Sequence, residues 1–310
     1  MKIQRPKVVE RAWGVEEWIA NGAYCAKRLI IPNGQIIRFH SHKKKHETFY
    51  VDSGSVKLGL DSEQKVLKKG DIVEVPAGYR HKVMALKDSV IIEASTHHED
   101  ADSYFHSAIF LDRDGVINKD LGAEIYKKDG TFDLFDKDIY LRRPEDIVFE
   151  ENAIEGMKRL IQMEFRLIIV TNQAGIGRGL LTEAEVDSVH EAMLKILSEN
   201  GIEIEKVYMC PHDEGEGKGR LKRRCENHKP RPGFLYNARQ DLDIDLSESF
   251  MVGDKLQDVM AGNLAGCRAV LMDTGWGGHC LEDETMAISM KPDFVAKDLL
   301  ELAETLAKTF

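Results

Sequence analysis

The sequence predicts two domains, an N-terminal all-β domain and a C-terminal α/β domain with a Rossmann-like parallel sheet. The chain has 310 residues, about twice the ~150 residues of a typical domain. Its first hundred residues contain short β-rich stretches separated by turn-forming residues, which favours a sandwich or a small barrel. The remainder alternates short apolar stretches with helical patterns, which is typical of parallel strands covered on both faces.

The charge distribution supports this division. Residues 1–105 carry 17 basic and 14 acidic side chains, residues 106–310 carry 26 and 39, and together they give the net charge of −10. We therefore predict one domain over 1–105, a polar connector over 97–106 and a second domain over 106–310. The acidic balance argues against a nucleic-acid-binding surface.

Membrane and disulfide classes are not expected. No apolar run approaches the roughly 18 residues that would span a bilayer, and the N-terminus lacks the apolar core of a signal peptide. The cysteines are scattered and odd in number: Cys25, Cys210, Cys225, Cys267 and Cys280. A cytoplasmic protein with reduced thiols is the interpretation that this usage favours.

The first domain carries a candidate metal site. Its β-rich stretches are 26–32, 48–60, 71–78, 81–86 and 89–96. One segment reads G-x5-H-x-H-x4-E-x6-G, with His40, His42 and Glu47, and a second reads G-x5-P-x-G-x2-H, ending in His81. His40 and His42 point to the same face of a strand, and a turn and second strand can bring Glu47 and His81 to them. This ligand set suits one transition metal, namely Mn, Fe, Ni, Zn or Cu.

These two segments resemble the two halves of the cupin signature, in order and in spacing. Ala85 stands where the second half often ends in an asparagine. Over residues 8–104 the chain is similar to cupins related to the mannose-6-phosphate isomerase domain. The resemblance implies a metal-binding β-barrel. Because many cupins bind a metal or a sugar without known chemistry, a catalytic and a binding role both stay open.

The second domain contains the strongest signal, the segment IFLDRDGVIN at residues 109–118. Its strands are expected at 107–112, 166–172, 206–210, 249–254 and 268–275, with helices over 151–163 and 182–200. Asp112 ends the first strand, where ligands of open α/β sheets bind, and Asp114 follows. Asp112 can attack phosphorus and form an aspartyl-phosphate. Asp114 can protonate the leaving oxygen and then accept a proton from water.

This pattern resembles the haloacid dehalogenase (HAD) superfamily of phosphatases, whose remaining motifs follow in order. The resemblance implies that Thr171 binds the phosphoryl oxygens and that Lys229 balances the charge of nucleophile and phosphate. It also implies a Mg²⁺ site made by Asp112, the backbone carbonyl of Asp114, and Asp254. Oxygen ligands and a phosphate substrate fit this ion.

Four segments sharpen the resemblance to one branch: DRDGVIN, TNQAGIGRG, CPH…C…KPRPG and MVGDKLQDVMAGN. Over residues 107–275 they are similar to the D-glycero-D-manno-heptose 1,7-bisphosphate phosphatases and to histidinol-phosphate phosphatases. This family has short loops where other HAD phosphatases carry a cap, so no large cap is expected. Asp258 is expected to support the metal ligands, the alternative being a position on the helix surface. The substrate contacts carried over are Arg113, Asp120, Asn172, Gln173, Lys229 and Lys255.

The family also has a structural zinc loop of the form C-x-H…C-x-C. Cys210, His212 and Cys225 match three ligands, and Asn227 stands where the fourth, a cysteine, is expected. A structural zinc site prefers four ligands. The resemblance therefore implies that His228 completes the site, that the site is weak, or that it is empty.

The leading hypothesis is a Mg²⁺-dependent phosphatase of a phosphorylated sugar whose cupin isomerises or epimerises the same class of molecule. One alternative is a cupin that only binds sugar or builds a homodimer. A second is a cupin isomerase with a phosphosugar-binding second domain. The basic loop 214–231 either receives a second anionic group of the substrate or is solvated. The segment 126–147 either covers the site or packs on the cupin.

Overall fold

The computed structural model describes residues 4–60, 63–131, 133, 135–278 and 291–309. The chain divides into two compact units. The first comprises 1–106 with 162–164 and 306–310, and the second comprises 107–161 with 165–305.

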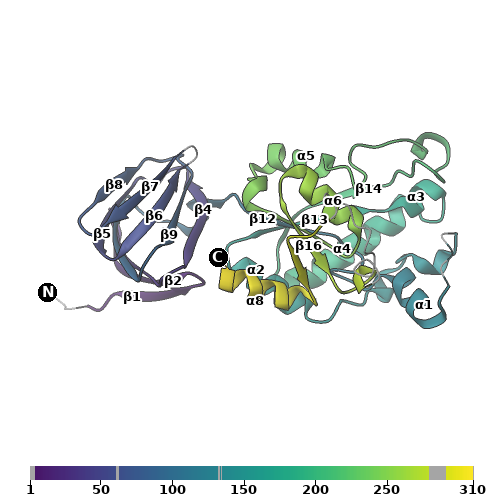
Figure 1. The fold of residues 1–310 in the computed structure, drawn as a ribbon, viewed down its shortest axis with the longest axis horizontal. Helices are drawn as coiled ribbons and strands as arrows, with labels where there is room; N and C mark the ends of the chain where they lie inside the picture. Colours follow the sequence, from purple (N-terminus) through teal and green to yellow (C-terminus); the bar gives the residue numbers. More distant parts are fainter. Residues whose placement is uncertain (1–3, 61–62, 132, 134, 279–290, 310) are drawn as a thin grey trace. The chain divides into compact units, whose positions relative to one another are not determined.

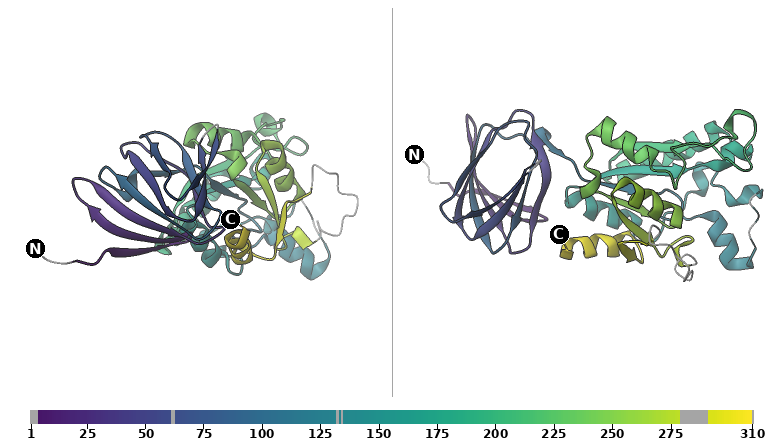
Figure 2. Two further views of the ribbon diagram at one scale, coloured as in Figure 1. Left: turned by 60° about the vertical axis from the view of Figure 1, so that its left-hand side comes forward. Right: turned by 45° about the horizontal axis from the view of Figure 1, so that its top comes forward.

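Two antiparallel sheets make up the first unit, and their strands wrap into a barrel (Figure 2). Among the described residues, one sheet has the order β1-β2-β3-β10-β5-β8 and the other the order β11-β4-β9-β6-β7. The strands are β1 (Lys7–Arg11), β2 (Gly14–Asn21), β3 (Cys25–Ile31), β4 (Ile36–His42), β5 (Glu47–Ser53), β6 (Ser55–Leu60), β7 (Gln64–Lys68), β8 (Ile72–Val75), β9 (His81–Ala85), β10 (Ser89–Ser95) and β11 (Ser103–Phe105).

Alternation along the strands places one face of each inside the barrel. In β3 every second residue is buried, from Cys25 to Ile31. Leu29, Ile31, Val51 and Ile91 belong to one apolar core cluster of this unit. The predicted all-β domain is confirmed, and its core is the space between the two sheets.

Two predicted boundaries within this unit differ from the structure. The stretch 48–60 is two strands, because Gly54 breaks it with φ +80°, where a Cβ atom would lie 2.4 Å from the Asp88 carbonyl oxygen. The predicted connector 97–106 is partly ordered in the barrel. It contains the 3₁₀ helix η1 (Asp100–Asp102) and β11, which pairs with β4.

The second unit is a parallel sheet with helices on both sides (Figure 1). The strand order among the described residues is β14-β13-β12-β15-β16-β17. The strands are β12 (Ala108–Leu111), β13 (Arg166–Asn172), β14 (Ile204–Cys210), β15 (Phe250–Gly253), β16 (Arg268–Met272) and β17 (Phe294–Ala296). β12 and β15 are buried along their whole length, as expected for strands covered on both faces.

Both predicted helices of this unit are present as α2 (Ala153–Gln162) and α4 (Glu183–Glu199), and the capping box between Thr182 and Glu185 is formed. The sequence did not identify α1 (Leu121–Asp129), α3 (Ala174–Arg178), α5 (Gly233–Leu242), α6 (Leu256–Ala265) and α8 (Leu299–Thr309). Short 3₁₀ helices are η2 (Lys137–Ile139), η3 (Pro144–Asp146), η4 (Gly219–Leu221) and η5 (Leu246–Glu248). In the part of the chain that the structure describes, no helix combines the length and the hydropathy that crossing a membrane would require.

The cysteines of the described residues are free thiols. They are Cys25, Cys210, Cys225 and Cys267. Cys280, which the sequence analysis counted with them, lies outside the described residues.

Candidate active site and metal centres

Three strand ends bring the predicted phosphatase residues to one edge of the parallel sheet. β12 lies between β13 and β15. After β12 the chain forms β13 and β14 on one side of it and then crosses to β15 on the other side, so the strand order reverses beside β12. Asp112 directly follows β12, Thr171 lies near the end of β13 and Asp254 directly follows β15. All three side chains are buried.

The turn after Asp114 requires a glycine. Gly115 has φ +84°, and a Cβ atom at this position would lie 2.3 Å from Oδ2 of Asp254. The glycine therefore permits the backbone after β12 to approach the carboxylate that follows β15.

Asp112, Asp254 and Asp258 form a buried carboxylate cluster, with one oxygen of each within 4.8 Å of the others. Burial raises the pKa of Asp112 to about 6 and that of Asp254 to about 8, and repulsion between neighbouring carboxylates contributes to both shifts. Crowded carboxylate oxygens are the donor set that Mg²⁺ accepts. Asp258 lies as close as the other two, whereas the Asp114 side chain is not part of this cluster.

Lys229 is the cation at the centre of the site, and its side chain is only 1% exposed. Its Nζ lies 2.9 Å from Oδ1 of Asp112 and 2.7 Å from Oδ1 of Asp258, and it donates to the Val170 carbonyl. Although burial opposes the charge, these carboxylates raise the pKa of Lys229. The predicted lysine and nucleophile are thus in direct contact.

Asp114 is held as a carboxylate by several donors. Nη2 of Arg113 lies 2.9 and 2.8 Å from its two oxygens, and Asn118 and Gln173 each donate to it at 2.9 Å. Although burial opposes ionisation, Arg113 and these hydrogen bonds lower the pKa of Asp114 to about 2. Arg113 is buried, and its Nη1 donates to Nε2 of His190 in α4 at 3.2 Å.

The predicted substrate contacts divide into two groups. Asn172 holds the backbone of Lys229: its Nδ2 donates to the Lys229 carbonyl, and its Oδ1 accepts from the Lys229 N–H, both at 3.1 Å. Gln173 bridges Thr171 and Asp114, donating to each at 2.9 Å. Asn172 therefore holds the Lys229 backbone, Gln173 holds two neighbouring side chains, and both residues line the pocket.

Lys255 and Asp120 form the second group. Nζ of Lys255 lies 2.9 Å from Asp120 and 3.1 Å from Asp254. Asp120 also caps α1 by accepting from the Ala123 N–H. The ion pair therefore ties the start of α1 to the carboxylate cluster.

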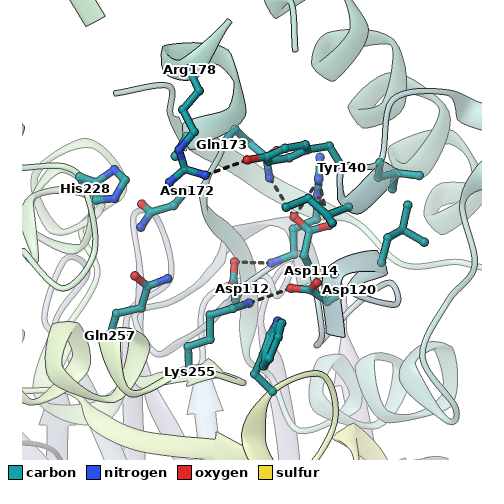
Figure 3. A pocket seen from close by; sticks show the side chains of 17 residues that line it. Asp112, Asp114, Asp120, Tyr140, Asn172, Gln173, Arg178, His228, Lys255 and Gln257 are labelled. Carbon is teal, nitrogen blue, oxygen red and sulfur yellow. Dashed lines mark hydrogen bonds and ion pairs between the residues drawn. The ribbon is translucent and has the colours of Figure 1, made fainter. Parts of the chain in front are cut away.

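A pocket of about 300 Å³ opens above Asp112 (Figure 3). The predicted residues Asp112, Arg113, Asp114, Asp120, Asn172, Gln173 and Lys255 line it. Ile139, Tyr140 and Leu141 also line it, so the segment 126–147 contributes to the wall of the site. Arg178 and Gln257 lie within motifs that the sequence analysis quoted without assigning them a role. Trp276 and Tyr140 carried no motif signal.

Arg178 joins the pocket-lining Tyr140 to Asp213, which lies in the loop after β14. Its Nε donates to Asp213 at 2.6 Å, and its Nη1 donates to the Tyr140 hydroxyl at 2.7 Å. Asp213 also accepts from the N–H groups of Gly215 and Glu216. The guanidinium therefore links α3 to the loop that follows β14.

The predicted zinc ligands come together only in part. Cys210, His212 and Cys225 each offer one ligand atom within 4.8 Å of the others, and Nδ1 of His212 lies 3.5 Å from Sγ of Cys210. Thiolates with an imidazole suit zinc. His228 is not part of this cluster; it lines the pocket above Asp112 instead.

The predicted metal ligands of the barrel converge. His40, His42, Glu47 and His81 each place one ligand atom within 4.8 Å of the others. Nδ1 of each histidine donates to a backbone carbonyl, namely those of Arg38 for His40, Asp102 for His42 and Tyr79 for His81.

This arrangement leaves the Nε2 lone pairs for a metal. Among the residues that the structure describes, Nε2 of His42 is buried without a hydrogen-bond partner, and burial lowers the pKa of His42 to about 4, which keeps the ring neutral. Nε2 of His81 lies 3.1 Å from Oε2 of Glu47. Neutral imidazoles oriented through their second nitrogen fit a transition-metal site.

Two residues that the sequence analysis missed support this site. Lys45 is buried and places Nζ 2.5 Å from Oε1 of Glu47 and 3.2 Å from Glu93. The Asp102 carboxylate accepts from the backbone N–H groups of residues 43–45 and so fixes the loop between two ligands. Asp102 lies in the predicted connector, where no local pattern marks it.

Comparison with known proteins agrees with both halves of this description. A HAD-hydrolase-like family model matches residues 227–302, and a cupin domain model matches residues 27–94. The D-glycero-β-D-manno-heptose-1,7-bisphosphate 7-phosphatase of Vibrio cholerae is 38% identical over 169 residues, which cover 54% of this chain and 82% of the relative. That of Escherichia coli K12 is 34% identical over 202 residues, 65% of this chain and 94% of the relative.

A solved structure shows the same relationship. The D,D-heptose 1,7-bisphosphate phosphatase of B. bronchiseptica, complexed with magnesium and phosphate, matches with a TM-score of 0.54 and 29% identity. It covers 66% of this chain and 99% of its own. The strand order of the sheet, the carboxylates at the strand ends and these relatives all indicate the same family. The chain therefore belongs to the heptose bisphosphate phosphatase family of the HAD hydrolases, and a cupin domain precedes its phosphatase domain.

Proposed function

We propose that the second unit hydrolyses the phosphate ester of a phosphorylated sugar in a Mg²⁺-dependent reaction through an aspartyl-phosphate on Asp112. The observation that carries this proposal is the Asp112 carboxylate beside Lys229 and among two further carboxylates at the switch point of the sheet. The relatives' names supply the substrate class, and the magnesium and phosphate of the B. bronchiseptica structure support the ion.

In the first step, a carboxylate oxygen of Asp112 attacks phosphorus and the bond from phosphorus to the sugar oxygen breaks. Asp114 donates a proton to that leaving oxygen, which departs as a hydroxyl. Lys229 offsets the negative charge of Asp112 and of the phosphoryl group, and Thr171 donates a hydrogen bond to a phosphoryl oxygen.

In the second step, water attacks the aspartyl-phosphate. Asp114 accepts a proton from the water, the bond from phosphorus to Asp112 breaks, and inorganic phosphate leaves with the carboxylate regenerated. The low pKa of Asp114 suits the carboxylate form in this half. In the first step Asp114 must carry a proton. We therefore propose that the incoming phosphate accepts some of the hydrogen bonds that Arg113 now donates to Asp114, which would raise the Asp114 pKa.

Asp112 and Asp254 would hold Mg²⁺ with the Asp114 carbonyl, and Asp258 adjoins them. When bound, the ion would supply positive charge that stabilises the phosphoryl oxygens, which become more negative in the transition state. Lys255 now lies 3.1 Å from Asp254, so we propose that it turns toward the substrate when the ion is present.

For the first unit we propose one transition metal on His40, His42, Glu47 and His81. When bound, the metal would supply positive charge to a sugar-phosphate oxygen during isomerisation or epimerisation, and this is the bifunctional form of the proposal. A cupin that binds sugar or builds a dimer is the second candidate. Although burial opposes its charge, Glu93 and Glu47 raise the pKa of the buried Lys45, so this ammonium holds Glu47 in place and is compatible with both candidates.

For the loop after β14 we propose a structural zinc on Cys210, His212 and Cys225. Three protein ligands leave a fourth position for water or another donor. Zinc would fix the loop that carries Asp213, the partner of Arg178. Elemental analysis of wild type and of Cys225→Ser tests this, since the substitution should release the zinc.

One experiment tests the main proposal. Phosphate release is measured for sugar phosphates with and without Mg²⁺, and the products are examined for isomerised sugar. Magnesium-dependent release is expected. Release that persists unchanged in EDTA would contradict the Mg²⁺ mechanism, and release without any isomerised product would favour the binding role of the cupin.

A further inference from the structure

The pocket has a polar side that the proposed reaction does not use. In Figure 3, His228 and Gln257 lie to one side of Asp112, and Arg178 lies beyond Asn172. None of these side chains belongs to the carboxylate cluster. This side is placed to meet the part of the substrate that does not react.

The described cations that line the pocket are already paired with carboxylates. Arg113 lies 2.8 Å from Asp114, and Lys255 lies 2.9 Å from Asp120. Lys229, buried beneath the pocket, contacts Asp112 and Asp258. In the proposed reaction these cations would surround the phosphate that is removed, so they would contact only that end of the substrate.

Arg178 is the cation of the polar side, and Asp213 neutralises it. Both Nε and Nη2 lie 2.6 Å from Asp213, and Nη1 donates to Tyr140 at 2.7 Å. Three of its five N–H groups are therefore engaged. A phosphate dianion here would face an ion pair of zero net charge, and desolvating that dianion without a free cation is costly.

His228 adds a neutral donor. Its Nδ1 is buried and has no hydrogen-bond partner among the described residues. A protonated ring would leave a buried N–H at Nδ1 without an acceptor, so the neutral form with hydrogen on Nε2 is favoured. Burial also lowers the pKa of this imidazole. Gln257 contributes a further uncharged amide to this wall.

The exposed bases of the neighbouring loop do not supply the missing charge. Lys218, Arg220, Lys222, Arg223 and Arg224 are all exposed, and none of them lines the pocket. Arg231 is paired with Glu214 at 2.7 Å. Of the two alternatives for the loop 214–231, the exposure of these five bases favours the solvated loop over a receiver of a second anionic group.

We infer that the enzyme acts on a sugar that carries a single phosphate, and that His228 and Gln257 bind free hydroxyl groups at the other end of that sugar. This inference rests on the proposed function and narrows its substrate class. It sets the chain apart from relatives whose names specify a 1,7-bisphosphate.

The test compares kcat/KM for two pairs of substrates, heptose 7-phosphate with heptose 1,7-bisphosphate and fructose 6-phosphate with fructose 1,6-bisphosphate. In each active pair the monophosphate is expected to be used at least tenfold better. His228→Arg adds an unpaired cation and should raise the ratio of bisphosphate to monophosphate kcat/KM about tenfold. His228→Gln, which keeps a neutral donor, should leave that ratio near the wild-type value.

A double variant of exposed loop residues, Arg220→Gln with Lys222→Gln, is the matched control and should not change the ratio. A wild type that prefers the bisphosphates, or a control that loses bisphosphate activity selectively, would overturn the inference while leaving the phosphatase proposal intact. A folded wild type that releases phosphate from none of the four substrates, nor from p-nitrophenyl phosphate, would contradict the proposed function itself.

Discussion

The Nη1 group of Arg113 donates a hydrogen bond to Nε2 of His190, 3.2 Å away in the middle of α4. Through this contact a helix on the flank of the sheet helps to orient the guanidinium that holds Asp114. His190→Ala removes the acceptor, so we expect kcat to fall about three- to tenfold with little change in KM, because a buried donor is left unpaired and the fork shifts. Steady-state kinetics check this.

The neighbouring Glu191 is exposed, and Glu191→Ala is the control that should retain wild-type kcat. His190→Gln, whose amide oxygen can accept the same bond, should recover part of the loss. Equal kcat in His190→Ala and wild type would show that Arg113 needs no support from α4.

Acidification should weaken the fold through the same histidine. Burial, and then the Arg113 charge, lower the pKa of His190 from its ordinary 6.5 to about 4. Between pH 6.5 and 4 the unfolded state therefore binds a proton at His190 that the folded state does not bind. The free energy of unfolding falls as the pH is lowered through this range. Urea unfolding at pH 7 and pH 4.5 should show a loss about 1 to 3 kcal/mol larger in wild type than in His190→Gln. Parallel losses in both proteins would contradict this assignment.

Asp112→Asn should reduce phosphate release by on the order of a thousandfold or more, because an amide cannot serve as the nucleophile. Rapid acid quenching of wild type during turnover should trap a phosphoryl group on the peptide that contains Asp112. Near wild-type turnover by Asp112→Asn would rule out the covalent mechanism.

Lys229→Met should destabilise the second unit by about 3 to 5 kcal/mol, since it leaves buried Asp112 and Asp258 without their cation. Denaturant unfolding measures the change, and added Mg²⁺ should restore part of it. Lys195→Met, on the exposed side of α4, is the control. A Lys229→Met protein as stable as the control would mean that the two carboxylates are protonated in the folded state.

His81→Ala should lower the transition-metal content of the full chain while Mg²⁺-dependent phosphate release stays near wild type, because His81 belongs to the barrel site only. Elemental analysis after incubation with Mn, Fe, Ni, Zn and Cu ions measures this. His97→Ala removes an exposed histidine of the same unit and should retain the metal. Equal metal content in the two variants would argue against the barrel site.

Much of the active site could be predicted because it depends on where strands end. Asp112, Thr171 and Asp254 each follow or finish an apolar stretch, and parallel strands end at one edge of the sheet. The barrel ligands could be predicted for a related reason, since His40 and His42 share a face by alternation. The sequence displays the relevant feature in both cases, namely the end of an apolar strand for the active site and the alternation of side chains for the barrel site.

The contacts that could not be predicted arise from packing between elements. His190 occupies an ordinary helical position, and only the docking of α4 against the loop after β12 brings it to Arg113. Tyr140 and Arg178 meet because a long connection folds over α3. The edge strand β1 was missed because its residues are mostly exposed and show no apolar period.

The histidines of the barrel are oriented by backbone carbonyls rather than by side chains. The acceptors for His40 and His81 are the main-chain carbonyls of Arg38 and Tyr79, so a substitution at either position that keeps the path of the backbone keeps the acceptor. The path of the backbone therefore determines how these imidazole rings are oriented. A mutational scan that replaces side chains would remove the four ligands one at a time but would leave these carbonyl acceptors in place.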